Sequence, residues 1–345
     1  MNYKSYLKEL EYITSTIRIR SPNSYEIDNQ VYSLEDNHST NKNKIMKPND
    51  GKDVISILES YIYNVFHCRQ KNNNSQAFFN LSYFDNRDFV ESISNANKGV
   101  GTWEPGWEVH RILDKESNNL VVKKNGLMLW VHSYQFIPYD QKKYSVGEKG
   151  YVSMVKEFRE LLSGFYMANG NVSLKENASV IRIYWNVSGD GAIPIMEHLT
   201  TELNDNHLPF QFKILNNINY FIRSDAAVLY IDKQNINDMG LSLSRIYKKI
   251  KPFLKPTTPL FAKKLASGLS LAEDPNNGES FGQNRSRILA EALYEIYNKN
   301  VLSITDQLVQ IGKHFSKNDI NIEKPFLKNN DSLDNYDEIL VGVFD

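Results

Sequence analysis

Residues 179–187 read SVIRIYWNV and carry the pattern that decides the fold. Val180, Arg182 and Tyr184 alternate with Ile181, Ile183 and Trp185. Because successive side chains of a strand point to opposite faces, this alternation predicts a strand with one polar and one apolar face. Two further strands are predicted near 209–215 and 226–231.

Outward from these strands, apolar residues recur at helical spacing. We predict helices over the following ranges: 151–168, 191–204, 234–251, 283–299 and 303–315. The segment 252–282 is punctuated by Pro and Gly and is predicted as a loop. EILVGVF near the end of the chain could add an edge strand. The mixture predicts an α+β fold with a mostly antiparallel sheet flanked by helices.

The N-terminal third has a different texture. We expect residues 1–100 to form a helical region, with helices near 4–19, 53–68 and 86–96 and a polar loop at 21–51. Short segments rich in Val, Leu and Trp at 107–113, 119–124 and 127–133 predict a small β-meander within 101–148. The polar stretch 139–150 is the predicted boundary before a catalytic region at 149–345.

Composition excludes several classes of protein. The 345 residues carry a net charge of −1, with 41% apolar and 23% charged residues. The protein therefore has no overall positive charge of the kind that would indicate nucleic acid or an anionic membrane as a partner. Cys68 is the only cysteine, so no internal disulfide and no multi-thiolate zinc site can form. No signal peptide or membrane span is predicted, which makes the cytoplasm the expected location.

Three features point to chemistry on a phosphate. Arg182 and Tyr184 share the polar face of one strand, and Lys213 interrupts an otherwise apolar strand. GESFGQNRSR (278–287) opens a helix with Arg285 and Arg287, and helix N-termini with nearby arginines suit a phosphate. The expected phosphate ligands are Arg182, Arg223, Lys263, Arg285 and Arg287.

Elimination of phosphate from phosphoserine or phosphothreonine needs such a set. A desolvated lysine can remove the α-proton, arginines can stabilise the leaving phosphate, and a tyrosine can donate a proton. We therefore predict Lys213 and Tyr184 as catalytic groups. The reaction requires no metal or other cofactor.

The stretch VIRIYWNV…LPFQFKIL…RSDAAVLYI…LASGLSLAEDPNNGESFGQNRSR resembles the HopA effector family, as do NKGVGTWEPGWEVHRI, GLMLWV and SGFYMANG. The resemblance covers roughly residues 93–295. Domains of that family also occur as the lyase partner of a kinase in class V lanthipeptide synthetases. The resemblance thus implies a phosphorylated precursor peptide as substrate and a separate kinase as partner. The separate texture of the N-terminal helices suggests that they dock a leader peptide or the kinase.

A fainter resemblance is to the phosphothreonine lyases among enteric type III effectors. Their catalytic lysine strand is similar to FKIL and implies Lys213 as the base. Their arginine and tyrosine pair resembles Arg223 and Tyr230, which implies Tyr230 as a further phosphate ligand. Their late arginines resemble Arg285 and Arg287. Their Lys-x-His strand corresponds to RIY, so this chain has no histidine at the position of the general acid.

Structural roles compete with each of these assignments. Lys213 could extend its amine to solvent from an edge strand, and Tyr184 could simply pack. Arg287 could pair with Glu291 one helical turn away, and Ser280 could cap the helix. Glu273 and Asp274 could orient a cation, or Asp274 could serve the turn before Pro275. A second function remains open as well: an effector or phosphopeptide-binding protein without turnover.

Overall fold

The computed structural model describes residues 3–34, 51–70, 86–114, 118–141, 143–175, 177–340 and 342–344. Its largest sheet has seven strands in the order β14-β15-β11-β13-β12-β10-β9, with antiparallel neighbours throughout. The strands are β9 Glu157–Leu162, β10 Phe165–Asn169, β11 Val180–Trp185, β12 Gln211–Leu215, β13 Ala227–Asp232, β14 Lys263–Ala266 and β15 Leu269–Glu273.

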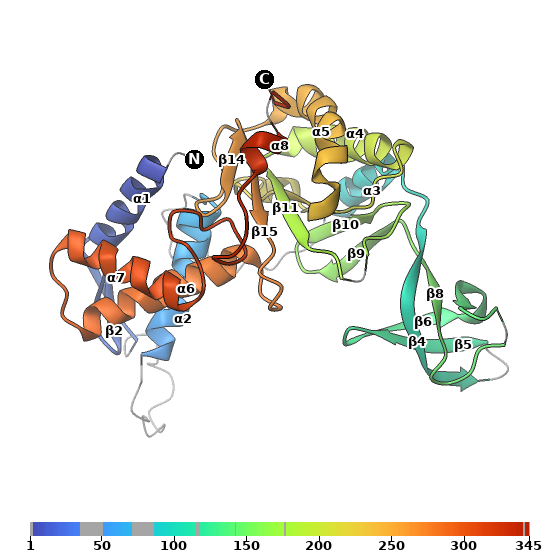
Figure 1. Cartoon of the computed structure of the whole chain (residues 1–345), viewed down its shortest axis with the longest axis horizontal. Coiled ribbons are helices and arrows are strands. Elements are labelled where there is room, and N and C mark those ends of the chain that lie inside the picture. Colours follow the sequence, from blue (N-terminus) through green and yellow to red (C-terminus); the bar gives the residue numbers. More distant parts are fainter. Residues whose placement is uncertain are drawn as a thin grey trace.

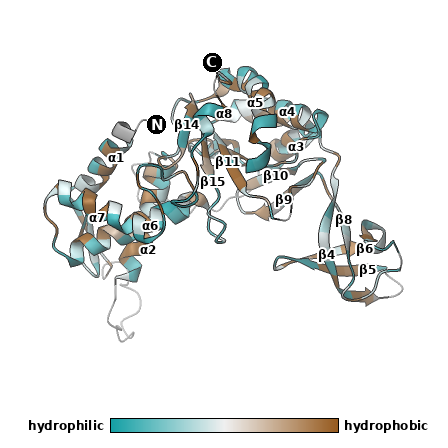
Figure 2. Ribbon diagram, in the orientation of Figure 1, coloured by the Kyte–Doolittle hydropathy of each residue, from teal (hydrophilic) through white to brown (hydrophobic). Residues whose placement is uncertain are grey.

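Three helices cover the apolar face of this sheet (Figure 1). They are α3 Arg87–Ala96, α4 Ala192–Asp205 and α5 Ile236–Ile250. Helix α5 buries Ile236, Met239, Leu243 and Ile246, spaced so that they fall on one side of a helix. Figure 2 shows hydrophobic and hydrophilic stretches alternating along the helices, as expected for helices with one buried side.

The N-terminal and C-terminal parts of the chain pack together beside the sheet (Figure 1). This part contains α1 Tyr3–Thr16, α2 Lys52–Tyr61, the π-helix η2 Ile62–His67, α6 Phe281–Asn298 and α7 Ile304–Lys317. Helix α8 Tyr336–Ile339 lies against α5 instead. A three-stranded antiparallel sheet joins them, formed by β1 Ile17–Ser21, β2 Ser24–Ile27 and β3 Gln30–Ser33. Single turns of 3-10 helix lie at η4 Ser133–Gln135, η5 Gly189–Gly191, η6 Ile218–Tyr220, η7 Lys233–Asn235 and η8 Lys251–Phe253.

A five-stranded antiparallel sheet projects from the body of the molecule (Figure 1). Its strands are β4 Thr102–Asp114, β5 Asn119–Lys124, β6 Leu127–His132, β7 Phe136–Pro138 and β8 Lys149–Met154, in the order β6-β5-β4-β8-β7. It has a hydrophobic core of its own around Trp107, Val122 and Val152. The larger core lies in the body of the molecule and includes α1, α6 and the seven-stranded sheet.

The predicted α+β class, the β-meander, the three central strands and the helices around them are confirmed. The helix predicted at 151–168 is wrong, because this segment forms β8, β9 and β10. The loop predicted at 252–282 contains β14 and β15, and residues 336–339 form α8 in place of an edge strand. The loop predicted at 21–51 contains β2 and β3; its remainder from 35 to 50 lies outside the described residues.

The division of the chain at residues 100 and 148 stays a prediction. Strand β8 pairs with β4 and β7, so the five-stranded sheet continues to Met154. Within the described ranges, no helix is long and apolar enough to cross a lipid bilayer.

Candidate functional site

The register of the seven-stranded sheet brings several predicted site residues onto one face. Arg182 pairs with Tyr230, and Tyr230 pairs with Gln211 on the next strand. In the neighbouring row Tyr184 pairs with Val228, and Val228 pairs with Lys213. Because directly paired residues of antiparallel strands lie on the same side, all of these share what we call the polar face. The apolar face, with Ile181, Ile183 and Phe212, lies against the helices.

Lys213 lies half-buried on the polar face of β12. Its Nζ is 4.5 Å from the centre of the Phe165 ring and 5.9 Å from that of Tyr230. Among the described residues it has no hydrogen bond or ion pair. The amine is therefore held by aromatic rings and is not occupied by a carboxylate, an arrangement that leaves it available to a ligand.

Arg182 and Tyr230 lie side by side next to this lysine. The Arg182 guanidinium is 5.4 Å from the centre of the Tyr230 ring. Its Nε and Nη2 donate to Asp274 Oδ2 at 2.7 and 2.6 Å. Guanidinium has five N–H donors, so this pairing with one oxygen leaves donors free for an anion. Asp274 also accepts a hydrogen bond from the amide of Asn276. It therefore both orients a cation and stabilises the turn, the two roles that the sequence analysis gave as alternatives.

Tyr184 is nearly covered by the elements packed on the polar face. It is 3% exposed, and its ring centre lies 6.2 Å from that of His67 and 6.4 Å from that of Phe281. Burial raises the pKa of the Tyr184 hydroxyl, and Arg182 beside it offsets only part of that rise. The phenol therefore stays protonated and lies at the buried edge of the polar face.

Arg223 belongs to a buried cluster with Asp225, Tyr63 and Cys68. It donates to Asp225 through Nε at 2.5 Å and Nη2 at 2.7 Å, to Tyr63 Oη at 3.0 Å and to Cys68 Sγ at 3.2 Å. Burial alone would raise the pKa of the Asp225 carboxyl, but Arg223, and more weakly Lys213, hold it well below its usual range. The arginine is 4% exposed, so the structure does not bring it to the surface that holds Lys213.

Lys263 lies on the opposite side of the sheet. It pairs with Leu271, which pairs with Ile183 on the apolar face. Its Nζ donates to Asp334 at 3.0 Å and to Asp337 at 2.8 Å. The structure therefore does not bring Lys263 together with Arg182 or Lys213.

The two arginines of GESFGQNRSR are both held by protein groups. Arg287 donates from Nε and Nη2 to Glu279 at 2.9 and 3.0 Å and from Nη1 to Glu291 at 2.8 Å. Arg285 is 1% exposed and donates to the carbonyls of Pro325 at 2.7 Å and Leu327 at 2.6 Å. Burial lowers the pKa of Arg285 to about 10.

The same segment docks α6 onto the polar face. Ser280 caps the helix by accepting from the amide of Gln283, as the capping alternative predicted. Phe281 is fully buried near Tyr184. A Cβ on Gly282 would lie 2.4 Å from Cδ2 of His67, so only glycine allows this close approach.

His67 and Asp225 are neighbours of the site that the sequence analysis missed. His67 ends the π-helix η2, whose fifth-neighbour bond from Cys68 N to Tyr63 O measures 2.8 Å. The only sequence feature at His67 is FHC at the end of an amphipathic helix. This feature is as typical of a helix end packed in the core as of a functional site. Asp225 follows Arg223 by two residues in RSDAAV, and that spacing could have indicated an ion pair.

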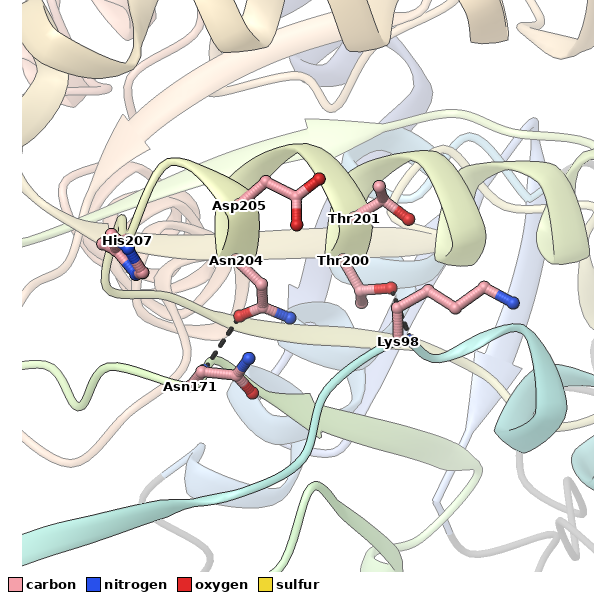
Figure 3. A pocket seen from close by; sticks show the side chains of 7 residues that line it. All are labelled: Lys98, Asn171, Thr200, Thr201, Asn204, Asp205 and His207. Carbon is pink, nitrogen blue, oxygen red and sulfur yellow. Dashed lines mark hydrogen bonds between the residues drawn. The ribbon is translucent and has the colours of Figure 1, made fainter.

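A separate hollow of about 680 Å³ lies beside the C-terminal half of α4 (Figure 3). It is lined by Lys98, Asn171, Thr200, Thr201, Asn204, Asp205 and His207. None of these is a predicted site residue. No group of three or more His, Cys, Asp or Glu side chains suited to a metal ion occurs within the described ranges.

A protein-family match begins at the first strand of the seven-stranded sheet and extends beyond its last strand. The HopA1 effector protein family matches residues 158–327, from β9 to the segment held by Arg285. Residues 158–327 are a HopA1 effector protein family domain. The predicted resemblance is confirmed for this part of the chain; the meander segments at 97–112 and 126–131 lie outside the matched residues. The HopA1 domain thus contains Arg182, Tyr230 and Lys213.

Two solved structures are similar to this chain. An effector protein from Pseudomonas syringae pv. tomato strain DC3000 is 16% identical, with 81% of this chain and 100% of the effector covered at a TM-score of 0.43. An effector protein from Pseudomonas syringae pv. syringae strain 61 is 15% identical, with 78% and 88% covered at a TM-score of 0.43. No curated protein matches the chain in sequence.

Proposed function

We propose that the chain is a phosphoserine or phosphothreonine lyase that acts on a phosphorylated precursor peptide and leaves dehydroamino acids. One observation carries this proposal: Lys213 and Arg182 lie on the same polar face, with Tyr230 next to both. Within the described part of the chain, the Lys213 amine has no carboxylate partner and the Arg182 guanidinium keeps further donors. These are the two groups that elimination of phosphate requires. The resemblance to lyase domains of lanthipeptide synthetases supports the same reaction.

In the proposed step, Nζ of Lys213 accepts the α-proton of the phosphorylated residue. The electrons of that C–H bond form the Cα=Cβ double bond as the Cβ–O bond breaks, and phosphate leaves with the electrons of the broken bond. Arg182 and Tyr230 hold the phosphate. Tyr184, buried against Arg182 and protonated, is the proposed proton donor.

The other predicted phosphate ligands are not part of this proposal. Arg223, Arg285 and Arg287 are engaged with Asp225, backbone carbonyls and two glutamates, and Lys263 faces away. Their contribution is to hold β13, α6 and the C-terminal segment in place. A separate kinase protein would supply the phosphorylated peptide.

The test is mass spectrometry of a synthetic phosphothreonine peptide incubated with the protein. Elimination yields a product one water lighter than the unphosphorylated peptide, whereas hydrolysis yields the unphosphorylated mass itself. We expect Lys213→Ala to lower the rate by at least about 100-fold, the usual contribution of a general base. Lys248→Ala, an exposed lysine on α5, which covers the apolar face, is the matched control and should keep the wild-type rate. A hydrolysis product, or full activity of Lys213→Ala, would refute the lyase.

Two tyrosine variants separate proton donation from phosphate binding. Tyr184→Phe should lower kcat with little change in KM, because the donor acts only as phosphate leaves. Tyr230→Phe should mainly raise KM, since its hydroxyl would contact phosphate in both the bound and the reacting state. The reverse pattern would exchange the two roles.

A second function is binding of a phosphopeptide without turnover, as an effector could require. The observation that favours it is the burial of Tyr184, which leaves the polar face without an exposed acid beside Lys213. In that case the phosphopeptide binds but no elimination product forms. Affinity should then depend on Arg182 and persist in Lys213→Ala.

A further inference from the structure

The proposed elimination needs a third kind of protein group, besides those that meet the α-proton and the phosphate. As Nζ of Lys213 accepts the α-proton, the electrons of the C–H bond are shared with the neighbouring carbonyl group of the substrate. Negative charge therefore develops on the carbonyl oxygen of the phosphorylated residue. A hydrogen-bond donor held at that oxygen stabilises the charge where it forms.

Gln211 lies in the same row of the polar face as Tyr230 and Arg182. It pairs directly with Tyr230 on β13, and Tyr230 pairs with Arg182 on β11. On its own strand Gln211 precedes Lys213 by two residues, so the two side chains point to the same side from Cα atoms about 7 Å apart. Gln211, Lys213 and Tyr230 are all partly exposed, so a ligand that meets one of them can meet the others.

The order of these residues across the sheet matches the order of chemical groups in a phosphorylated residue. Along the substrate the carbonyl carbon is followed by the α-carbon, the β-carbon and the phosphate. Across the sheet Gln211 and Lys213 lie on β12, Tyr230 on β13 and Arg182 on β11. A substrate with its phosphate at Arg182 and Tyr230 and its α-proton at Lys213 therefore directs its carbonyl oxygen toward the β12 side of the face.

The side-chain amide of Gln211 is oriented by two hydrogen bonds in series. Asn169 Nδ2 donates to the carbonyl of Val155 at 3.0 Å, which leaves Asn169 Oδ1 as the acceptor for Gln211. Gln211 Nε2 donates to this oxygen at 3.4 Å. Within the described ranges this is the only side-chain hydrogen bond of Gln211. Because a primary amide has two N–H donors, one donor is left for a ligand.

We propose that Gln211 donates a hydrogen bond to the carbonyl oxygen of the phosphorylated residue and stabilises the negative charge that develops there. This assignment rests on the proposed function. The electrons of the C–H bond pass through the carbonyl group and then form the Cα=Cβ double bond as the Cβ–O bond breaks and phosphate leaves. Gln211 keeps its protons throughout. A neutral amide donor suits the neutral carbonyl of a residue inside a peptide chain.

Steady-state kinetics of the whole protein with the synthetic phosphothreonine peptide test this role. Gln211→Met keeps an unbranched side chain and removes both N–H donors. Gln211→Glu keeps the size and an acceptor oxygen but has no N–H, so it separates donation from acceptance. Gln30→Met, an exposed glutamine on β3 of the three-stranded sheet, is the matched control. The urea midpoint of each variant is measured beside its kinetics.

We expect Gln211→Met and Gln211→Glu each to lower kcat at least about 100-fold, the usual contribution of a donor to a developing oxyanion. KM should stay within about threefold, because the hydrogen bond strengthens only as the α-proton leaves. The urea midpoints should match the wild type, and Gln30→Met should keep the wild-type kcat and KM.

Several outcomes overturn the inference. Full activity of Gln211→Met excludes any role in the reaction, and full activity of Gln211→Glu excludes donation. A higher KM with unchanged kcat makes Gln211 a contact of the bound substrate alone. A lower kcat that comes with a lower urea midpoint assigns Gln211 to the stability of the sheet.

The wild-type reaction keeps the two proposals apart. Wild-type protein that forms no elimination product refutes the lyase, and this inference with it. Elimination that depends on Lys213 but not on Gln211 refutes only the inference.

Discussion

His67 is a neutral histidine at the buried edge of the candidate site. Its ring lies between those of Tyr63 and Phe261, with centres 5.7 and 5.6 Å away, and the residue is 1% exposed. Nδ1 has no hydrogen-bond partner among the described residues. Burial lowers the pKa of His67 to about 3, although Asp225 opposes this shift. Packing thus holds the ring next to Tyr184 in its uncharged form.

The pKa of His67 should make the free energy of unfolding depend on pH. In the unfolded chain an exposed histidine has a pKa of about 6.5. Between about 6.5 and 3 the unfolded chain binds a proton that the folded chain does not. The free energy of unfolding therefore falls as pH drops below about 6.5, by up to about 1.4 kcal/mol per pH unit. His67→Gln should remove this component.

Urea denaturation of both proteins between about pH 5 and 7.5 measures the effect. The difference in the free energy of unfolding between wild type and His67→Gln should be largest at the neutral end and shrink toward the acidic end. Parallel pH profiles would mean that folding does not change the pKa of His67.

Helix α6 shows how a motif that suggested phosphate binding is used in packing. In GESFGQNRSR, Ser280 caps the helix, Phe281 fills the core, and Arg287 pairs with Glu279 and Glu291. Gly282 allows the helix to approach His67. The segment therefore holds the start of α6 over Tyr184, and this packing buries that edge of the polar face.

Gly282→Ala should therefore destabilise the protein. A helical glycine replaced by alanine normally gains up to about 1 kcal/mol. Here the added Cβ would lie 2.4 Å from the His67 ring, and overpacking of this kind costs about 1–3 kcal/mol. Gly312→Ala in α7 is the matched control, because its Cβ would meet only Ile322 at 3.7 Å and should stabilise. Opposite shifts in the urea midpoint are expected; a gain for both would show that His67 yields easily.

At the scale of elements, the sequence predicted best where periodicity was long and uninterrupted. Strands β11, β12 and β13 and helices α4, α5, α6 and α7 were predicted close to their bounds. Residues 151–168 have apolar residues that fit a helix as well as short strands, and pairing of β8 with β4 and of β9 with β10 decides for strands. Strand β15 is buried throughout, so it has no alternation to reveal it within a segment marked by Pro and Gly.

Over the whole molecule, the C-terminal segment is anchored to the sheet by buried polar groups. Arg285 holds the carbonyls of Pro325 and Leu327, and Glu273 accepts from the amide of Lys328 at 2.9 Å. The amide of Glu273 in turn donates to Phe326 O. Because Asp274 follows Glu273 and binds Arg182, these contacts also position the cation of the polar face.

Arg285→Met should loosen this anchor. Two buried carbonyls would lose their donors, which costs roughly 2–4 kcal/mol in the free energy of unfolding. The amides of Glu273 and Lys328 should exchange hydrogen for deuterium faster than in the wild type. Arg287→Met, two residues along the same helix, removes only partly exposed ion pairs and should cost about 1 kcal/mol or less. Equal losses for the two variants would contradict this assignment of roles.

The sequence by itself determined which residues alternate along each strand. It thereby placed Arg182 on the same strand face as Tyr184, and it placed Lys213 inside an otherwise apolar strand. It also determined the family resemblance that the match over 158–327 confirms. Only the tertiary structure decided which cations can meet a ligand. Local periodicity specifies the face of a strand or helix, but not what another segment places against it. Arg285 meets the carbonyls of residues 325 and 327, and β14 pairs so that Lys263 faces the helices. Lys213, by contrast, has only aromatic rings beside its amine among the residues that the structure describes.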